Sequence, residues 1–313
     1  MAFDVSVIIP VYNGENKIKY SIDSVLKQKN VSVEIIVIND GSTDSTLEVL
    51  KTYSERYDHI KVFTQPNLGV SSARNKGIEV AKGTYVCFLD ADDFYEDNYL
   101  NEMLTKIKYD RKKVCYCGYK IVTPQGIRVK RTKFSKVEVL KKYILGQAAL
   151  HTTSWLIDRQ FLIDNSVKFP EGVSWGEDFE FFCEVLSLTK EVTFVKKHLT
   201  NYRFGYEENQ LSSFSMDKID KDVESILRLI SNKRISNQEG ITDSLLNYRL
   251  QALITYRLLT AVELNVEASK TLNYYRKYNN YLSDLSKING LRSIKLELSK
   301  KKLSNKISNL SHR

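Results

Sequence analysis

The sequence has few cysteines and no long apolar run. Its 313 residues include four cysteines, which have neither the spacing of a zinc site nor the density of a disulfide framework. The longest apolar runs, such as residues 7–11, are far shorter than the roughly 20 residues that cross a bilayer. The first residues lack the basic segment and long apolar core of a secretory leader. We therefore expect a cytoplasmic protein without a membrane span.

Sequence signals of two other protein classes are also absent. No Gly-x-Gly-x-x-Gly follows the first predicted strand, which argues against a dinucleotide-dependent oxidoreductase. Basic residues are not interleaved with aromatic residues on a predicted sheet, so we expect no nucleic-acid partner. The net charge of +9 lies at the end of the chain, where residues 270–313 contain 11 basic and two acidic residues. The rest of the chain is therefore neutral overall.

The first half of the chain alternates predicted strands with predicted helices. Short apolar runs predict strands over residues 5–11, 33–38, 60–63 and 85–89, and stretches of helical periodicity connect them. Strands joined by helical crossovers imply a parallel, doubly wound α/β sheet.

The second half has a different pattern. Helices are predicted over residues 99–107 and 177–188, and strands over residues 114–122 and 192–195. From about residue 217 onward only helical patterns remain, so we expect an all-α C-terminal region.

Three carboxylates follow the fourth predicted strand directly: Asp90, Asp92 and Asp93. Open α/β sheets bind ligands at the carboxyl ends of their strands. Clustered negative charge is unfavourable unless a cation neutralises it, and oxygen ligands of this kind suit Mg²⁺ or Mn²⁺. Such clusters also occur in solvated loops and at helix starts, so the neighbouring strand ends must decide between the two interpretations.

Polar residues occur at the other predicted strand ends as well. Asp40 follows the second strand, Tyr12 ends the first, and Arg74 lies in the helix before the fourth. Arg74 offers a fixed fork for phosphate or a carboxylate. Asp40 could accept a hydrogen bond from a base or ribose, and Tyr12 could stack on a ring. Because these ends meet in one crevice, the sequence predicts a site for a phosphorylated ligand.

Four motifs in this order resemble the family 2 glycosyltransferases with the GT-A fold, as found in bacterial capsule, cell-wall and protein-glycan synthesis. They are Val-Ile-Ile-Pro-Val-Tyr-Asn at 7–13, Ile-Asn-Asp-Gly-Ser-Thr-Asp at 38–44, Asn-Leu-Gly at 67–69 with Ser-Ala-Arg-Asn-Lys-Gly at 72–77, and Phe-Leu-Asp-Ala-Asp-Asp at 88–93. The resemblance implies a GT-A domain over residues 1–214, with a Rossmann-like nucleotide-sugar half (1–93) and an acceptor half (94–214). Residues 215–313 would form a helical, basic C-terminal region.

The resemblance also implies a UDP-sugar donor and a role for each matching residue. Asp40 would contact the uracil, Asp90 the ribose or sugar, and Asp92 would ligate Mn²⁺ or Mg²⁺ on the diphosphate. The metal would stabilise the leaving group. The residues implied in the nucleotide-sugar site are Pro10, Tyr12, Asp40, Asn67, Arg74, Asp90 and Arg203.

The second half contributes two further matches. Trp-Gly-Glu-Asp at 175–178 resembles the Glu-Asp motif of the family, which makes Asp178 the general base for the acceptor hydroxyl and Glu177 its neighbour. Alternatively, both acids merely favour a helix N-terminus. Residues 202–213 resemble a lid over the diphosphate, with Arg203 on a phosphate. The chain departs from the pattern here, because Asn-Gln-Leu at 209–211 stands where many relatives have Gly-Gln-Ser.

The basic C-terminal region is open to two interpretations. Its lysines and two apolar sets at helical spacing, which are Leu291, Ile294 and Leu298 and then Leu303, Ile307 and Leu310, are typical of a helix on an anionic membrane surface. Alternatively, this helix mediates homo-oligomerisation. We expect an enzyme that transfers a sugar to a growing glycan, peripherally attached to the inner face of the plasma membrane. The alternative function is a non-catalytic nucleotide-sugar-binding subunit of a glycosylation complex.

Overall fold

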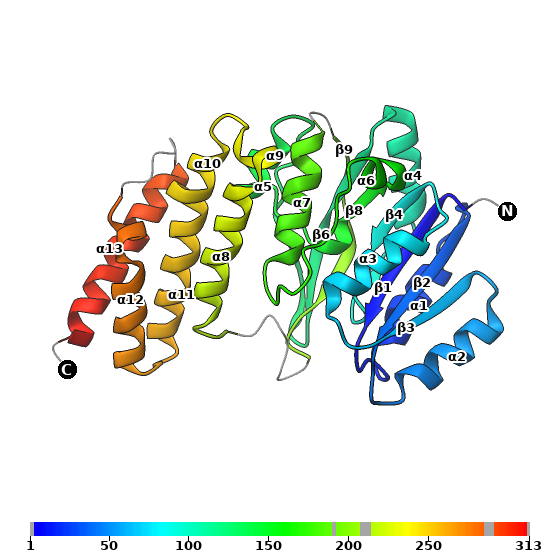
Figure 1. The fold of residues 1–313 in the computed structure, drawn as a ribbon, viewed down its shortest axis with the longest axis horizontal. Coiled ribbons are helices and arrows are strands. Elements are labelled where there is room, and N and C mark those ends of the chain that lie inside the picture. The colour runs from blue at the N-terminus through cyan, green and yellow to red at the C-terminus, as the bar shows by residue number, and fades with distance from the viewer. Residues whose placement is uncertain (1–2, 190–191, 207–213, 285–290, 312–313) are drawn as a thin grey trace. The chain divides into compact units, whose positions relative to one another are not determined.

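The computed structural model describes residues 3–189, 192–206, 214–284 and 291–311, and the chain divides into two compact units, Met1–Leu211 and Ser212–Arg313 (Figure 1). The first unit contains a nine-stranded mixed sheet in the order β3-β2-β1-β4-β8-β6-β9-β5, with β7 paired to β6. The second unit is helical throughout its described residues.

The predicted parallel half of the sheet is confirmed. It consists of β1 (Val5–Val11), β2 (Val33–Asp40), β3 (Ile60–Gln65) and β4 (Tyr85–Phe88), all paired in parallel. The crossovers are α1 (Ile18–Leu26), α2 (Thr46–Arg56) and α3 (Val70–Val80). Every residue of β1 is buried, as expected for a central strand whose two faces are both covered.

The position of Pro10 in β1 explains how a central strand can contain a proline. Leu89 N donates to Ile8 O at 3.0 Å, so the even-numbered residues of β1 direct their backbone groups toward β4. β4 pairs with β1 only as far as Ile8, so Pro10 lies beyond the end of β4. Its missing N–H therefore removes no hydrogen bond from the ladder. The same early end of β4 places Asp90 beside the end of β1.

The other half of the sheet departs further from the sequence prediction. β8 (Trp155–Asp158), β5 (Phe94–Tyr95) and β7 (Gly126–Val129) complete the sheet around β6 (Val114–Thr123). β9 runs from Thr193 to Arg203 and therefore extends well beyond the predicted end at residue 195. Its middle residues are exposed and polar, which masks the apolar signal of a strand, and pairing with β6 and β5 keeps it extended.

Helices and an aromatic core hold the second half of this unit in place. The helices are α4 (Tyr99–Asp110), α5 (Val139–Ile144), α6 (Arg159–Asp164) and α7 (Glu177–Leu188), and η1 (Thr152–Ser154) is a single 3₁₀ turn. In the core, the Phe181 ring of α7 stacks on Phe169 at 3.8 Å and meets Phe88 of β4 edge-on at 5.7 Å. Phe88 is two residues before Asp90, so this packing brings the start of α7 to the end of β4.

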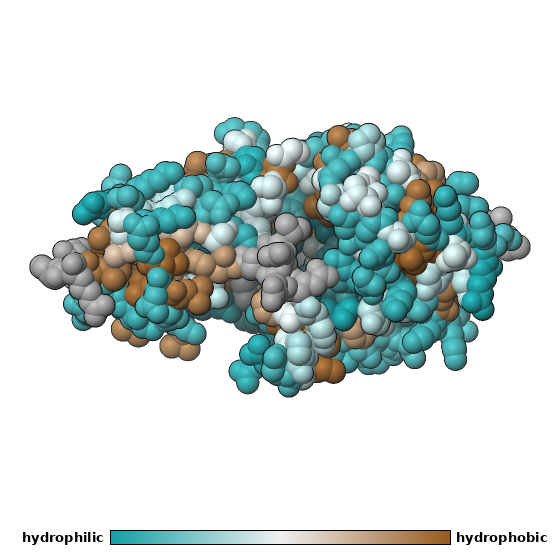
Figure 2. All heavy atoms as spheres, turned by 90° about the horizontal axis from the view of Figure 1, so that it is seen from below, coloured by the Kyte–Doolittle hydropathy of each residue, from teal (hydrophilic) through white to brown (hydrophobic). Residues whose placement is uncertain are grey.

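The second unit confirms the expected all-α C-terminal region in its described residues. It contains α8 (Lys218–Ser231), α9 (Lys233–Ser236), α10 (Ile241–Ser244), the π-helix η2 (Leu245–Leu250), α11 (Gln251–Glu263), α12 (Ala268–Ser283) and α13 (Leu291–Ser311). A buried ion pair joins Asp222 of α8 to Arg257 of α11. In Figure 2, hydrophobic residues gather on one face of this unit among hydrophilic ones. Among the described residues, no helix combines the length and apolar character needed to span a membrane.

Candidate active site

The loop after β3 is held against the end of β2 by Asp40. Its Oδ1 accepts hydrogen bonds from Leu68 N at 2.9 Å and from the Gln65 side chain, and its Oδ2 accepts one from Gly69 N at 2.8 Å. Asp40 is buried, so the residue expected to contact the uracil also shapes the loop beside it. Gly41 allows the close approach, because a Cβ there would lie 2.7 Å from Asn67 N and its φ is +73°.

Two other residues predicted for the nucleotide site are exposed to solvent. Tyr12 and Asn67 are exposed, whereas Pro10 is buried in the strand. The exposed Tyr12 ring follows the end of β1 and is available for stacking.

The acidic residues after β4 differ strongly in environment. Asp93 is fully buried, and its Oδ1 accepts a hydrogen bond from Arg203 N at 2.9 Å. Its Oδ2 has no hydrogen-bond partner within the described residues. Burial, together with the charges of Asp90 and Asp92, raises the pKa of Asp93 well above its ordinary value. A buried carboxylate oxygen without a donor is suited to a cation.

His151, which the sequence does not single out, completes this acidic cluster. Its Nδ1 is 3.6 Å from Asp93 Oδ2, and one ligand atom each of Asp90, Asp93 and His151 lies within 4.8 Å of the others. Burial lowers the pKa of His151, so the imidazole is neutral at neutral pH, which is the form that binds metals. The ring lies against Tyr202, with centroids 4.6 Å apart.

This donor set fits a divalent cation. Two carboxylates and a neutral imidazole suit Mn²⁺, and the carboxylates alone suit Mg²⁺. Asp92, which the resemblance assigns to the metal, is not in the three-residue cluster; it is half-buried at the same strand end, and its charge acts on Asp93. Its assignment stays a prediction.

Arg74 connects the acidic cluster to α7. Its side chain is 5% exposed, and Nη2 donates to Asp90 Oδ1 at 2.7 Å while Nη1 lies 3.5 Å from Glu177 Oε1. Burial acts to raise the pKa of Asp90, but the charge and hydrogen bond of Arg74, together with His151, lower it below its ordinary value. The sequence predicts that Arg74 binds phosphate or a carboxylate, and in the structure its guanidinium contacts two carboxylates, one at the end of β4 and one on α7.

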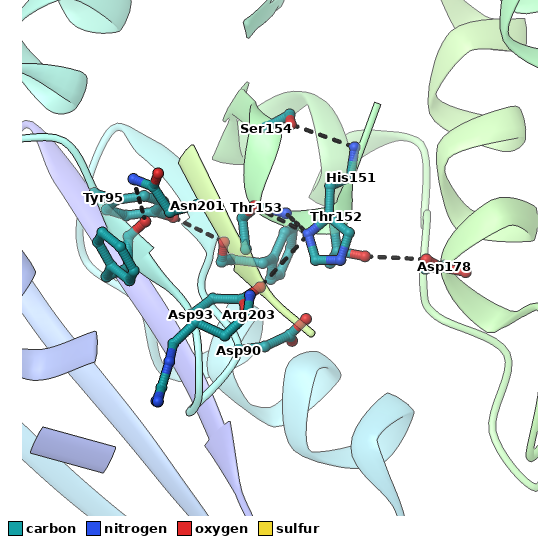
Figure 3. Close-up of polar contacts among 12 residues, drawn as sticks. Asp90, Asp93, Tyr95, His151, Thr152, Thr153, Ser154, Asp178, Asn201 and Arg203 are labelled. Carbon is teal, nitrogen blue, oxygen red and sulfur yellow. Dashed lines mark hydrogen bonds and ion pairs between the residues drawn. The ribbon is translucent and has the colours of Figure 1, made fainter. Parts of the chain in front are cut away.

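The first turn of α7 carries the expected catalytic pair. Asp178 Oδ1 accepts a hydrogen bond from Phe179 N at 2.6 Å, and Oδ2 accepts one from the Thr152 hydroxyl at 3.1 Å. Burial and the charge of Asp178 raise the pKa of Glu177 to about 7, although Arg74 opposes the rise. In Figure 3, His151 and Thr152 lie between the acidic cluster and Asp178.

Arg203 ends β9 beside the same cluster. Its guanidinium lies between two aromatic rings, 4.5 Å from the centroid of Tyr20 and 4.3 Å from that of Tyr206. These cation–π contacts hold a positive charge near the site. The remaining lid residues named from the sequence, 209–213, lie outside the described residues.

Comparison with known proteins identifies the family. The model of the family "Glycosyl transferase family 2" matches residues 6–183. The chain is 34% identical over 194 residues to the uncharacterized glycosyltransferase YibD of Escherichia coli K12, an alignment that covers 56% of each protein. It is 26% identical over 314 residues to a cholesterol galactosyltransferase of Borreliella burgdorferi, with 92% of this chain and 84% of that protein covered. The chain thus spans little more than half the length of the first of these relatives.

A solved structure shows the same fold. The crystal structure of Staphylococcus aureus TarS residues 1–349 in complex with UDP-GlcNAc superimposes with a TM-score of 0.74. The superposition covers 98% of this chain and 90% of that one, at 20% sequence identity. The expected GT-A fold is therefore confirmed. The matched family model covers more than half of the chain, which therefore belongs to glycosyl transferase family 2.

Proposed function

We propose that the protein is an inverting, metal-dependent glycosyltransferase that moves a sugar from a UDP-sugar to a hydroxyl group of a growing glycan, which is carried on a lipid or protein or belongs to a surface polysaccharide. The observation that carries this proposal is that one buried arginine, Arg74, contacts both Asp90 at the end of β4 and Glu177 in the first turn of α7. The acids expected on the donor side and on the acceptor side are thereby held in one site. The UDP-GlcNAc bound by TarS supports a UDP-sugar as donor.

The chemistry requires a base and a stabilised leaving group. Asp178 would accept the proton of the acceptor hydroxyl as its oxygen bonds to the anomeric carbon. The bond from that carbon to the diphosphate would break on the opposite face, so the configuration inverts and UDP leaves with the electron pair. Asp90, Asp93 and His151 would hold Mn²⁺ or Mg²⁺, with Asp92 as a further ligand that the family resemblance implies, and the metal would supply positive charge for the departing diphosphate.

The proposal is tested by UDP release from a panel of UDP-sugars with Mn²⁺, with and without EDTA. Asp92→Ala should lower the release at least about 100-fold, because it removes a metal ligand. Asp178→Asn should bind the donor as tightly as the wild type in calorimetry and yet fail to transfer its sugar. Asp58→Asn, an exposed carboxylate after α2, is the matched control and should behave as the wild type.

Two other outcomes would decide against catalysis. A wild type that binds one UDP-sugar but never releases UDP would be the non-catalytic binding subunit. A wild type that binds no UDP-sugar in either condition would overturn both functions.

We also propose that the second unit attaches to an anionic membrane surface through α13. Leu291, Ile294 and Leu298 share one face of this helix and are 85%, 58% and 64% exposed, whereas Leu303 and Ile307 on the opposite face are buried. The exposed lysines Lys295, Lys301 and Lys302 surround the apolar stripe at helical spacing. Of the two apolar sets predicted from the sequence, only the first is therefore available to a membrane.

Charge and homology both favour a lipid surface over a protein partner. The net +9 of residues 270–313 complements anionic lipids. The match to the cholesterol galactosyltransferase, whose name denotes a lipid acceptor, covers 92% of the chain.

Sedimentation with phosphatidylcholine vesicles containing about 30% phosphatidylglycerol tests this attachment. Serine at all three stripe positions should abolish co-sedimentation. Tyr256→Ser, which changes an exposed aromatic of α11, should not. Membrane attachment would be overturned if the triple variant bound the vesicles as well as the wild type. It would also be overturned if the only effect of the substitutions were a change from dimer to monomer in light scattering, and that result would identify α13 as a homo-oligomer interface.

A further inference from the structure

The 3₁₀ turn η1 lies between the acidic cluster and α7, and its first residue contacts the expected base. Thr152 is 3% exposed, and its hydroxyl donates to Asp178 Oδ2 at 3.1 Å. We propose that Thr152 is a positioning residue that sets the orientation of Asp178. This inference rests on the proposed function, because it assumes that Asp178 is the base.

The turn has hydrogen bonds of its own that do not involve Asp178, so we expect Thr152 to orient Asp178 and not the reverse. His151 Nδ1 accepts a hydrogen bond from Thr153 N, and the Ser154 hydroxyl accepts one from His151 N at 3.3 Å, which closes a reciprocal capping box. Tyr99 donates its hydroxyl to the Thr153 carbonyl at 3.2 Å. Thr152 is also β-branched, so its χ1 angle has few alternatives in a buried turn.

The same turn is anchored on the donor side. His151 precedes Thr152 directly, and its imidazole lies between Asp93 and the ring of Tyr202. Two consecutive residues of one closed turn thus face the acidic cluster and the base, as Figure 3 shows. The backbone of the turn therefore fixes the distance between the acidic cluster and the base Asp178. A link through a flexible side chain would leave that distance variable. A reaction that needs the base on the face opposite the leaving group depends on that separation.

The hydroxyl also completes the hydrogen bonding of the carboxylate. Thr152 donates to Asp178 Oδ2 and Phe179 N donates to Oδ1, so a donor of the fold orients each oxygen. The other charged or titratable groups that act on this region include Glu177 on the same helix, Arg74 on α3, His151 on the turn and Asp90 after β4. Thr152 adds a neutral hydrogen-bond donor to this set and leaves the net charge unchanged.

Three variants test the proposal with the UDP-sugar that the wild type hydrolyses. Thr152→Val removes the hydroxyl and keeps the branched shape, whereas Thr152→Ser keeps the hydroxyl. Thr200→Val is the matched control, because Thr200 is fully buried on β9 and its hydroxyl has no hydrogen-bond partner in the part of the chain that is described.

For Thr152→Val we expect kcat to fall about tenfold, with the KM of the donor within about twofold of the wild type, because the contact is to the base and not to the donor. Thr152→Ser should restore most of the lost kcat, because it keeps the hydroxyl. Thr200→Val should match the wild type in both kcat and KM.

The possible failures can be told apart. A wild type that hydrolyses none of the UDP-sugars overturns the proposed function and this inference with it. An active wild type with a Thr152→Val variant that equals Thr200→Val overturns the inference alone. A Thr152→Val variant that loses rate together with a lower melting temperature, and whose rate Thr152→Ser does not restore, shows a merely structural role and also overturns it. If the valine variant does not fold, Thr152→Ala is compared with Thr152→Ser in the same assays.

Discussion

Replacement of Arg74 by methionine should show how much its buried guanidinium contributes to the free energy of unfolding. The guanidinium is 5% exposed and lies 2.7 Å from Asp90 Oδ1 and 3.5 Å from Glu177 Oε1. At an effective dielectric constant of about 20, these separations correspond to attractions of about 6 and about 5 kcal/mol before the cost of burying the ions is subtracted. Removing one partner of a buried ion pair typically costs about 3–5 kcal/mol, and we expect a loss of that size at pH 7.

The loss should shrink at acidic pH. Burial acts to raise the pKa of Asp90, but Arg74 lowers it below the ordinary value, so this contact stabilises the fold at neutral pH and is lost as the pH falls through the folded pKa. Glu177 acts in the opposite sense: its pKa is raised to about 7, so its ionisation destabilises the folded protein as the pH rises from about 4.5 to 7. Arg74 limits that destabilisation, and the variant should therefore be weakest at neutral pH and above.

Urea unfolding followed by tryptophan fluorescence at pH 7 and pH 3 measures both effects, because the buried Trp155 stacks on Phe182 of α7. Lys76→Met is the control on the same helix; its exposed pair with Glu79 should contribute no more than about 1 kcal/mol. An Arg74→Met variant that unfolds like Lys76→Met would refute the reasoning. So would a stability difference from the wild type that is undiminished at pH 3.

Three further predictions concern other parts of the first unit. The pKa of Glu177 is raised to about 7, and the negative charge that it gains there favours proton transfer in the site, so kcat/KM for donor hydrolysis should rise through about pH 7 in the wild type. Glu177→Gln should flatten that rise; an unchanged inflection would mean that another group titrates. Gly41→Ala should cost about 2–4 kcal/mol in thermal unfolding and weaken donor binding, because its Cβ would lie 2.7 Å from Asn67 N. Gly172 has a similar φ of +70° but no atom within 4 Å of the added Cβ, so Gly172→Ala should cost only about 1–2 kcal/mol. Equal losses in the two variants would show that backbone strain, and not the contact with Asn67, determines the cost. The buried Glu34 accepts hydrogen bonds from the Ser6 hydroxyl, Lys82 N and Gly83 N. Chemical denaturation should therefore show a loss of about 3 kcal/mol or more in the free energy of unfolding for Glu34→Ala and a clearly smaller loss for Glu34→Gln. Equal losses would contradict a role of Glu34 as a hydrogen-bond acceptor.

Much of the donor side of the site follows from local sequence pattern. Alternating strands and helices lead to a parallel sheet, and the carboxyl ends of parallel strands meet at one edge. Asp40, Arg74 and Asp90 could therefore be placed together from their positions after or before predicted strands. Asp178 was instead assigned through the resemblance of residues 175–178 to the Glu-Asp motif of the family, which begins a periodic helix.

The contacts within the site could not be predicted, because they join residues far apart in the chain. Arg74 meets Glu177 only because Phe88, Phe169 and Phe181 pack α7 against β4. His151 and Thr152 belong to a short polar segment without periodicity, and they reach the site because β8, which follows η1, pairs antiparallel with β4 and β6.

The two apolar sets of α13 show the same division between sequence and structure. Helical spacing predicts both sets equally well, since spacing records only that the residues share a face. Packing within the second unit buries Leu303 and Ile307 and leaves Leu291, Ile294 and Leu298 exposed. The sequence by itself thus determined the elements, their order and the strand ends that carry the acids, because these depend on local periodicity and chirality. Tertiary structure alone decided which side chains pair, which carboxylates are buried and which apolar face remains in solvent, because these depend on long-range packing.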